Sequence, residues 1–174
     1  EEALRSFDSA LPALTSRWNL VYHRPAVTYF EGKDGLKKIY ENLVNDNATE
    51  VLVLRSPLDE GVLTEAYFAS HAKARAERGT KTRIITNREA TDKLKIFDRE
   101  VSRERRVWSD LDIPSEIDIW GDKVALISFE GQIIGTLIES KAVAETLKRL
   151  FGKIWQSLGQ TEAKQESADK PGRL

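Results

Sequence analysis

The sequence of 174 residues contains no cysteine, which excludes disulfides, thiolate nucleophiles and thiolate metal sites. It has only two histidines, His23 and His71, which are too few for a histidine-rich metal centre. We therefore expect neither a metal nor a cofactor. The 27 lysines and arginines nearly balance the 28 aspartates and glutamates, and the net charge of -1 gives no general attraction to nucleic acid or to an anionic membrane.

Long apolar runs are also absent. No stretch approaches the roughly 20 residues that a membrane span requires, and no signal peptide opens the chain, so we predict a soluble, cytoplasmic protein that does not enter a membrane. Methionine is missing altogether, and the chain begins with Glu1. These two features lead us to expect a fragment whose natural N-terminus lies upstream.

The first segment, residues 1–24, is predicted to be a helical linker. Its apolar residues recur at alternating three- and four-residue steps, which is typical of a helix that pairs with another helix, although Pro12 interrupts the pattern. We interpret it as a dimerisation segment, and a helix packed on its own domain is the alternative. The predicted seam consists of Leu4, Phe7, Leu11, Leu14 and Trp18.

The next part, up to residue 86, alternates between strand and helix patterns. Residues 27–30 form a strand, Gly32 and Gly35 mark a turn, and a helix follows to about residue 45. The apolar run at 50–55 and the strand at 81–86 enclose a helix over 59–78, which together form a βαβ unit.

The second half begins with a predicted helix over 89–108, whose charged face we expect to be solvated because acids alternate with its bases. A β meander over 115–138 and a helix from Ser140 to Gly159 follow, and residues 160–174 read as a polar tail. The fold class is therefore α/β, with a mixed, largely parallel sheet and helices on both faces.

Candidate ligand-binding residues follow the predicted strands, because ligands of open parallel sheets bind beyond the carboxyl ends of the strands. Such a group of side chains can orient an anion or a hydroxyl-rich ligand. The alternative is that these residues only cap strands and helices. The candidates are Glu31, Arg55, Ser56, Asn87 and Arg88.

Three blocks of the sequence, in this order, resemble TrmB-like transcriptional regulators. They are PAVTYFEGKDGLKKIYE (25–41), SEIDIWGDKVALISF (115–129) and IESKAVAETLKRLF (138–151), and the resemblance covers about residues 11–158. It implies a winged helix-turn-helix before this chain, a helical dimerising linker, and a C-terminal domain related in fold to phospholipase D over residues 25–159. We do not expect the additional C-terminal sugar-binding domain that some members carry, so sugar sensing does not carry over.

The same resemblance implies that this phospholipase D-like domain is not catalytic. That family uses the motif His-x-Lys-x4-Asp, and the matching positions here hold Pro114, Glu116 and Gly121. The one His-x-Lys sequence, at His71, lies in the middle of a predicted helix and is followed by Arg78 where the motif requires aspartate. No other pattern of a nucleophile with its base is present.

We therefore expect the effector-sensing and dimerisation domain of a TrmB-like regulator, without catalytic activity. Its expected partners are a second copy of the chain, a small-molecule effector, and DNA only through a winged helix that this chain lacks. Two alternatives stay open. One is a protein-interaction domain without a ligand, and the other is a divergent phosphodiesterase of the phospholipase D superfamily.

Overall fold

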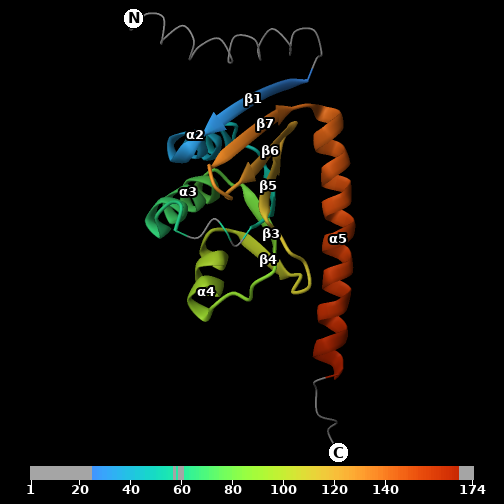
Figure 1. The fold of residues 1–174 in the computed structure, drawn as a ribbon. Helices are drawn as coiled ribbons and strands as arrows, with labels where there is room; N and C mark the ends of the chain where they lie inside the picture. Colours follow the sequence, from blue (N-terminus) through green and yellow to red (C-terminus); the bar gives the residue numbers. More distant parts are fainter. Residues whose placement is uncertain (1–24, 57, 59–60, 169–174) are drawn as a thin grey trace, which may run out of the picture.

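The computed structural model describes residues 25–56, 58 and 61–168, and in this part of the chain one sheet is covered by helices on both faces (Figure 1). Helices α2, α3 and α4 lie on one face, and the long helix α5 runs along the other. The strands are β1 (Ala26–Glu31), β2 (Glu50–Leu54), β3 (Lys81–Thr86), β4 (Arg103–Val107), β5 (Ser115–Trp120), β6 (Lys123–Ser128) and β7 (Ile134–Glu139). The helices are α2 (Gly32–Asn45), α3 (Glu65–Glu77), α4 (Asp92–Glu100) and α5 (Lys141–Ala168).

The strand order across the sheet is β1-β7-β6-β5-β2-β3-β4. Strand β2 pairs in parallel with β3, and β3 in parallel with β4. The other four pairings are antiparallel. The α/β class, the mixed sheet and the helices on both faces are thus confirmed. The expectation that most pairings are parallel is wrong, because the antiparallel meander β5-β6-β7 belongs to the same sheet and is joined in antiparallel fashion to β2 on one side and to β1 on the other.

The predicted helix over 89–108 is the main error in the assignment of elements. Helix α4 ends at Glu100, and Ser102 adopts a positive φ of 51°, a conformation that a helix cannot contain. The chain then forms β4, whose residues pair with β3 from Thr82↔Arg103 to Thr86↔Val107. Pairing with a neighbouring strand therefore overrides the helical spacing that the sequence suggests.

Other boundaries also differ from the expectation. Helix α3 begins at Glu65, where Thr64 accepts a capping hydrogen bond from the backbone N–H of Tyr67, and not near residue 59. Helix α5 continues through Gly159 to Ala168, so the predicted tail begins too early. The predicted dimer seam over residues 4–18 lies outside the described residues.

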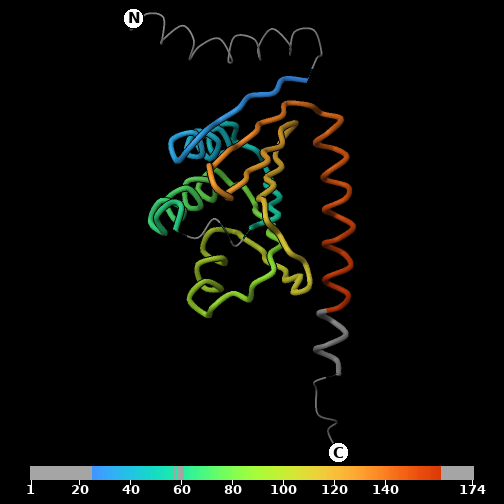
Figure 2. Tube along the Cα trace, in the orientation of Figure 1, coloured from blue at the N-terminus to red at the C-terminus, as the bar shows by residue number. Residues whose placement is uncertain are grey.

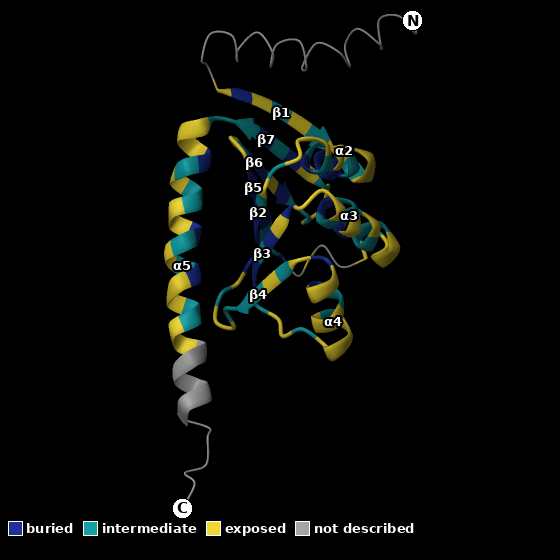
Figure 3. Cartoon of the chain, turned by 180° about the vertical axis from the view of Figure 1, so that it is seen from behind, coloured by how far each residue is buried: buried dark blue, intermediate teal, exposed yellow. Residues whose placement is uncertain are grey.

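Two hydrophobic clusters hold the layers together. The first joins α2 to the sheet through Leu36, Ile39 and Leu43, and α3 packs against it. The second lies under α5, where Phe151 stacks on Trp155 with ring centroids 5.7 Å apart. Figure 3 shows the buried residues concentrated in the inner strands of the sheet and the exposed residues of each helix on its outer side.

Close packing of α2 on the sheet depends on two glycines. A Cβ at Gly35 would lie 3.0 Å from the backbone of Phe30, and a Cβ at Gly135 would clash with the Ile39 side chain. The strand-to-helix turn after β1 uses Gly32 at a φ of 67°. Among the described residues, no helix is both long and apolar enough to cross a bilayer.

Candidate functional site

A small polar cavity lies between the sheet and helices α2 and α3. Its volume is about 40 Å³, which is room for a few water molecules or one small ion. Successive residues of a strand point to opposite faces, so Glu116 and Asp118 of β5 enter the cavity together. Its lining consists of Tyr40, Leu43, Val53, Arg55, Phe68, His71, Arg75, Thr82, Ile84, Arg103, Glu116 and Asp118.

The floor of the cavity is acidic and almost inaccessible to solvent. Glu116 is 3% exposed and Asp118 is 1% exposed. The Tyr40 hydroxyl donates a hydrogen bond of 2.7 Å to Glu116 Oε1. Burial, followed by the charges of Glu116 and Asp118, raises the pKa of Tyr40 well above its usual value, so the hydroxyl stays a neutral donor.

Three arginines form the basic side of the cavity. Arg75 of α3 is buried, and burial lowers the pKa of its guanidinium, although the nearby carboxylates oppose that shift. Burial likewise lowers the pKa of Arg103 to about 10, which leaves the group charged at neutral pH. Arg55 lies over the ring of Phe68, 5.3 Å from the centroid, and this contact fixes the guanidinium at the wall.

Arg103 is held by a buried acid on the neighbouring helix. Asp98 of α4 accepts from Arg103 Nη1 at 3.2 Å and from Arg105 Nε at 3.0 Å. All three side chains are at most 11% exposed. The expectation that the charges of residues 89–108 form a solvated face is therefore wrong for these three, because β4 turns its arginines back toward α4.

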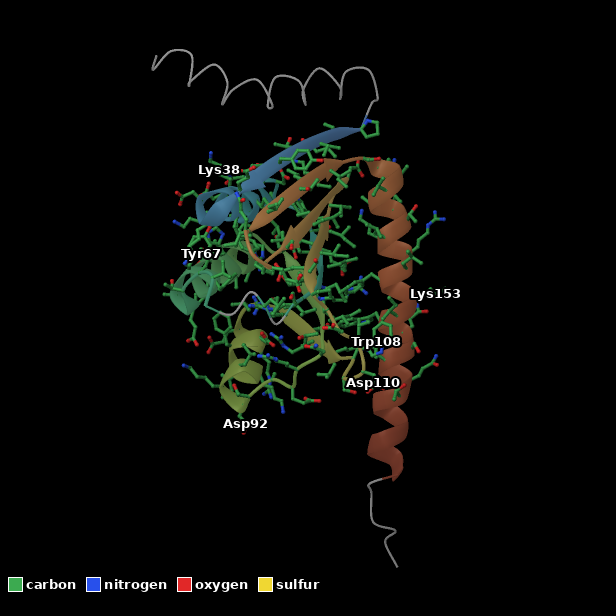
Figure 4. All side chains as sticks on the ribbon, viewed as in Figure 1. Lys38, Tyr67, Asp92, Trp108, Asp110 and Lys153 are labelled. Carbon is green, nitrogen blue, oxygen red and sulfur yellow. The ribbon has the colours of Figure 1, made fainter. Side chains whose placement is uncertain are left out.

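His71 occupies the helical side of the cavity. Its ring lies 4.3 Å from that of Tyr67, and Figure 4 shows Tyr67 on the side of the sheet away from α5. Burial and the charge of Arg75 lower the pKa of His71, which favours the neutral imidazole near pH 7. Its Nδ1 atom is buried and has no hydrogen-bond partner among the described residues.

The structure brings only one of the five predicted ligand-binding residues to this cavity, namely Arg55. Glu31 ends the edge strand β1, where Gln132 donates to it at 3.4 Å. Three strands separate β1 from β2, so Glu31 lies roughly 19 Å across the sheet from the strand that leads to Arg55. Figure 2 shows β1 at the opposite end of the sheet from α4. The expectation that Glu31 faces a pocket with Arg55 is wrong.

The other three predicted residues lie at the ends of β2 and β3 but do not line the cavity. Ser56 is fully buried and its Oγ accepts from the N–H of Leu58 at 3.2 Å, which is the capping role considered as the alternative. Asn87 is partly buried, and its Oδ1 has no hydrogen-bond partner in the described part of the chain. The Arg88 side chain is exposed.

Most of the residues that line the cavity were not predicted from the sequence. Glu116 carried a signal, because the resemblance placed it at the position of the catalytic lysine. Asp118 alternates with isoleucines, a pattern that usually means a solvated side chain, but this strand is covered on both faces. Arg75 lies on a helix with almost no apolar periodicity, so nothing local indicated its burial.

Comparisons with known proteins found matches among solved structures only. No protein-family model matches the sequence, and no curated protein matches it either. Solved structures match over most of the chain at low sequence identity. TrmBL2, described as an archaeal chromatin protein with a novel mode of DNA binding, has a TM-score of 0.56 at 16% identity and covers 90% of this chain, which spans 64% of that protein.

Two further matches are covered over almost their whole length by this chain. NucT from Helicobacter pylori has a TM-score of 0.56 at 14% identity, with 77% of this chain and 98% of NucT covered. Nuc from Salmonella typhimurium, a phospholipase D family member, has a TM-score of 0.55 at 13% identity, with 76% and 95% covered. At these identities the likeness concerns the fold alone, and it supports a phospholipase D-like fold.

Proposed function

We propose that this chain is the effector-sensing and dimerisation domain of a TrmB-like transcription regulator and that it catalyses no reaction. In this proposal a winged helix outside the chain contacts DNA, and the regulator acts in the cytoplasm. The sequence blocks at 25–41, 115–129 and 138–151 support the family, and the phospholipase D-like fold agrees with the domain that such a regulator carries.

The observation that carries the non-catalytic part is the environment of Glu116. This residue stands where the family motif requires lysine, and its carboxylate is buried and bound to the Tyr40 hydroxyl. A glutamate at this position cannot supply the positive charge that the lysine of the motif offers to a phosphodiester. The position of the nucleophilic histidine is occupied by Pro114, which has no side-chain nucleophile.

A phosphodiesterase assay tests this part of the proposal. Purified protein is incubated with bis-p-nitrophenyl phosphate, and a phospholipase D-family phosphodiesterase serves as the positive control. We expect no turnover above the blank. Turnover that co-purifies with the protein and disappears in an E116Q variant would overturn the non-catalytic assignment.

The competing phosphodiesterase function has one specific observation in its favour, since His71 lines the same cavity. A histidine beside arginines is a possible nucleophile for a phosphodiester. However, the His71 ring forms a hydrogen bond with the backbone of Tyr40, and α3 holds it in the packed wall of the cavity. Turnover that H71Q abolishes and E116Q leaves intact would favour this second function.

Dimerisation is the other part of the proposal. The apolar seam of residues 4–18 supports it, and sedimentation velocity over a hundredfold concentration range measures it. We expect a dimer that the double substitution L11E/L14E converts to a monomer. A chain that stays monomeric at every concentration would contradict dimerisation by this segment.

A further inference from the structure

Two buried hydrogen-bond donors of arginines that line the cavity lack an acceptor among the described residues. The Nε atoms of Arg75 and Arg103 are both buried, and neither has a hydrogen-bond partner among the described residues. Unsatisfied buried donors are rare in native proteins, and leaving a charged group partly unpaired is costly. Both donors belong to side chains that line the same cavity, one on α3 and the other on β4.

The charges around the cavity are also unequal. Four guanidinium groups meet three carboxylates, because Arg55, Arg75 and Arg103 line it and Arg105 joins through Asp98. The carboxylates are Asp98, Glu116 and Asp118. The buried groups balance, because Arg75, Arg103 and Arg105 face the three acids, so the one excess positive charge belongs to the partly buried Arg55. An excess positive charge at the partly desolvated wall of the cavity attracts an ion of opposite sign.

The size of the cavity limits what this ion can be. A volume of about 40 Å³ is far below the roughly 300–1,000 Å³ of sites that enclose drug-sized ligands, so a sugar does not fit inside it. A compact anion with several oxygen acceptors fits both the volume and the unpaired N–H donors. Guanidinium groups favour such anions because their planar N–H pairs match two oxygens at once.

We propose that the cavity binds a small oxyanion, held by Arg75 and Arg103 from inside and by Arg55 at the wall. The inference rests on the proposed function, because it names the chemical class of the effector. The acids have a different role here: Glu116 and Asp118 keep the arginines charged and in place, and the Tyr40 hydroxyl occupies one oxygen of Glu116. The ion is either free in solution or the terminal group of a larger molecule.

Thermal denaturation and calorimetry with defined probes test the proposal. Phosphate, sulfate and acetate are compared with chloride at equal ionic strength, and phenyl phosphate represents a terminal group on a larger molecule. We expect a saturable rise in Tm with at least one oxyanion and none with chloride. Binding of phenyl phosphate as tightly as phosphate identifies a terminal group as an accepted source, and binding of phosphate alone identifies the free ion.

Matched variants locate the site. R75Q removes a buried donor and its charge, and we expect at least tenfold weaker binding. R83Q is the control, since Arg83 lies on the α5 face of β3 and pairs with Glu50, and we expect it to bind like the unchanged protein. If R75Q fails to fold, R55Q alters the less buried wall residue and is expected to weaken binding in the same direction.

Three results would overturn the inference. They are the absence of a specific oxyanion effect up to about 50 mM, equal binding by the unchanged protein, R75Q and R55Q, and weakened binding in R83Q alone. A wider metabolite screen separates the two proposals. A neutral ligand that stabilises the protein while oxyanions do not would leave effector sensing intact and refute only the oxyanion.

Discussion

The buried acid of helix α4 gives the sharpest test of the charged network. Replacing Asp98 by asparagine preserves the shape of the side chain but leaves Arg103 and Arg105 without their shared carboxylate. Removing one partner of a buried ion pair typically costs about 3–5 kcal/mol. The side chains of Asp98 and Arg103 are each 7% exposed, and that of Arg105 is 11% exposed, so water cannot replace the lost contact.

Urea denaturation followed by circular dichroism measures this loss as a change in the free energy of unfolding. For a chain of this size, each kcal/mol shifts Tm by about 2–4 °C, so D98N should melt roughly 6–20 °C lower. Asp34 provides the control, because its side chain is 91% exposed and pairs only with Lys37. D34N should change stability by less than about 0.5 kcal/mol.

A different outcome would refute the reasoning. If D98N costs less than about 1 kcal/mol, the group of Asp98 and its two arginines is solvated in solution. The charges of residues 89–108 would then behave as the exposed face that the sequence suggested. A loss of equal size in D34N would point to a general effect of net charge and not to burial.

Three further predictions concern single groups. Y40F should lower the free energy of unfolding in urea by about 1–3 kcal/mol, because it removes the buried hydroxyl that donates to Glu116, and an unchanged value would contradict the contribution of this hydrogen bond. The pKa of His71 is lowered in the folded protein, so the unfolded chain binds a proton more readily, and the free energy of unfolding should fall as pH decreases below about 6.5. Thermal melts from pH 7.5 to 5 measure this dependence, and H71Q should make it weaker. An unchanged pH dependence in H71Q would contradict the pKa shift. G152A should raise the free energy of unfolding by about 0.5–1 kcal/mol, since a Cβ there meets nothing within 4 Å inside α5, and a destabilised variant would show a hidden contact.

Local pattern was sufficient to predict most of the elements. The apolar run of β2 and the following helix and strand form the expected parallel βαβ unit. The meander β5-β6-β7 has the expected order, with its first turn at Gly121, where φ is 48°. These elements were predictable because periodicity, β propensity and turn glycines are properties of neighbouring residues.

The order of the strands in the sheet could not be predicted from local sequence patterns. Strand β1 joins β7, from Ala26↔Glu139 to Glu31↔Ile134, and this places the first strand of the sheet beside the last strand in the chain. Nothing within residues 26–31 distinguishes that pairing from one beside β2, because both satisfy the same backbone groups. The position of Glu31, far from the cavity, follows from this choice of neighbour.

The residues of the cavity were likewise only partly predictable from the sequence. The sequence by itself determined that β5 alternates acid and apolar side chains and that Arg55 follows β2, because a strand repeats every two residues. Only the tertiary structure decided that Glu116 and Asp118 are buried, since α2 and α3 cover the face toward which they point. It likewise brought Arg75 and Arg103 together from distant elements. Burial and charge pairing depend on which surfaces meet, and residues far apart in the chain decide that.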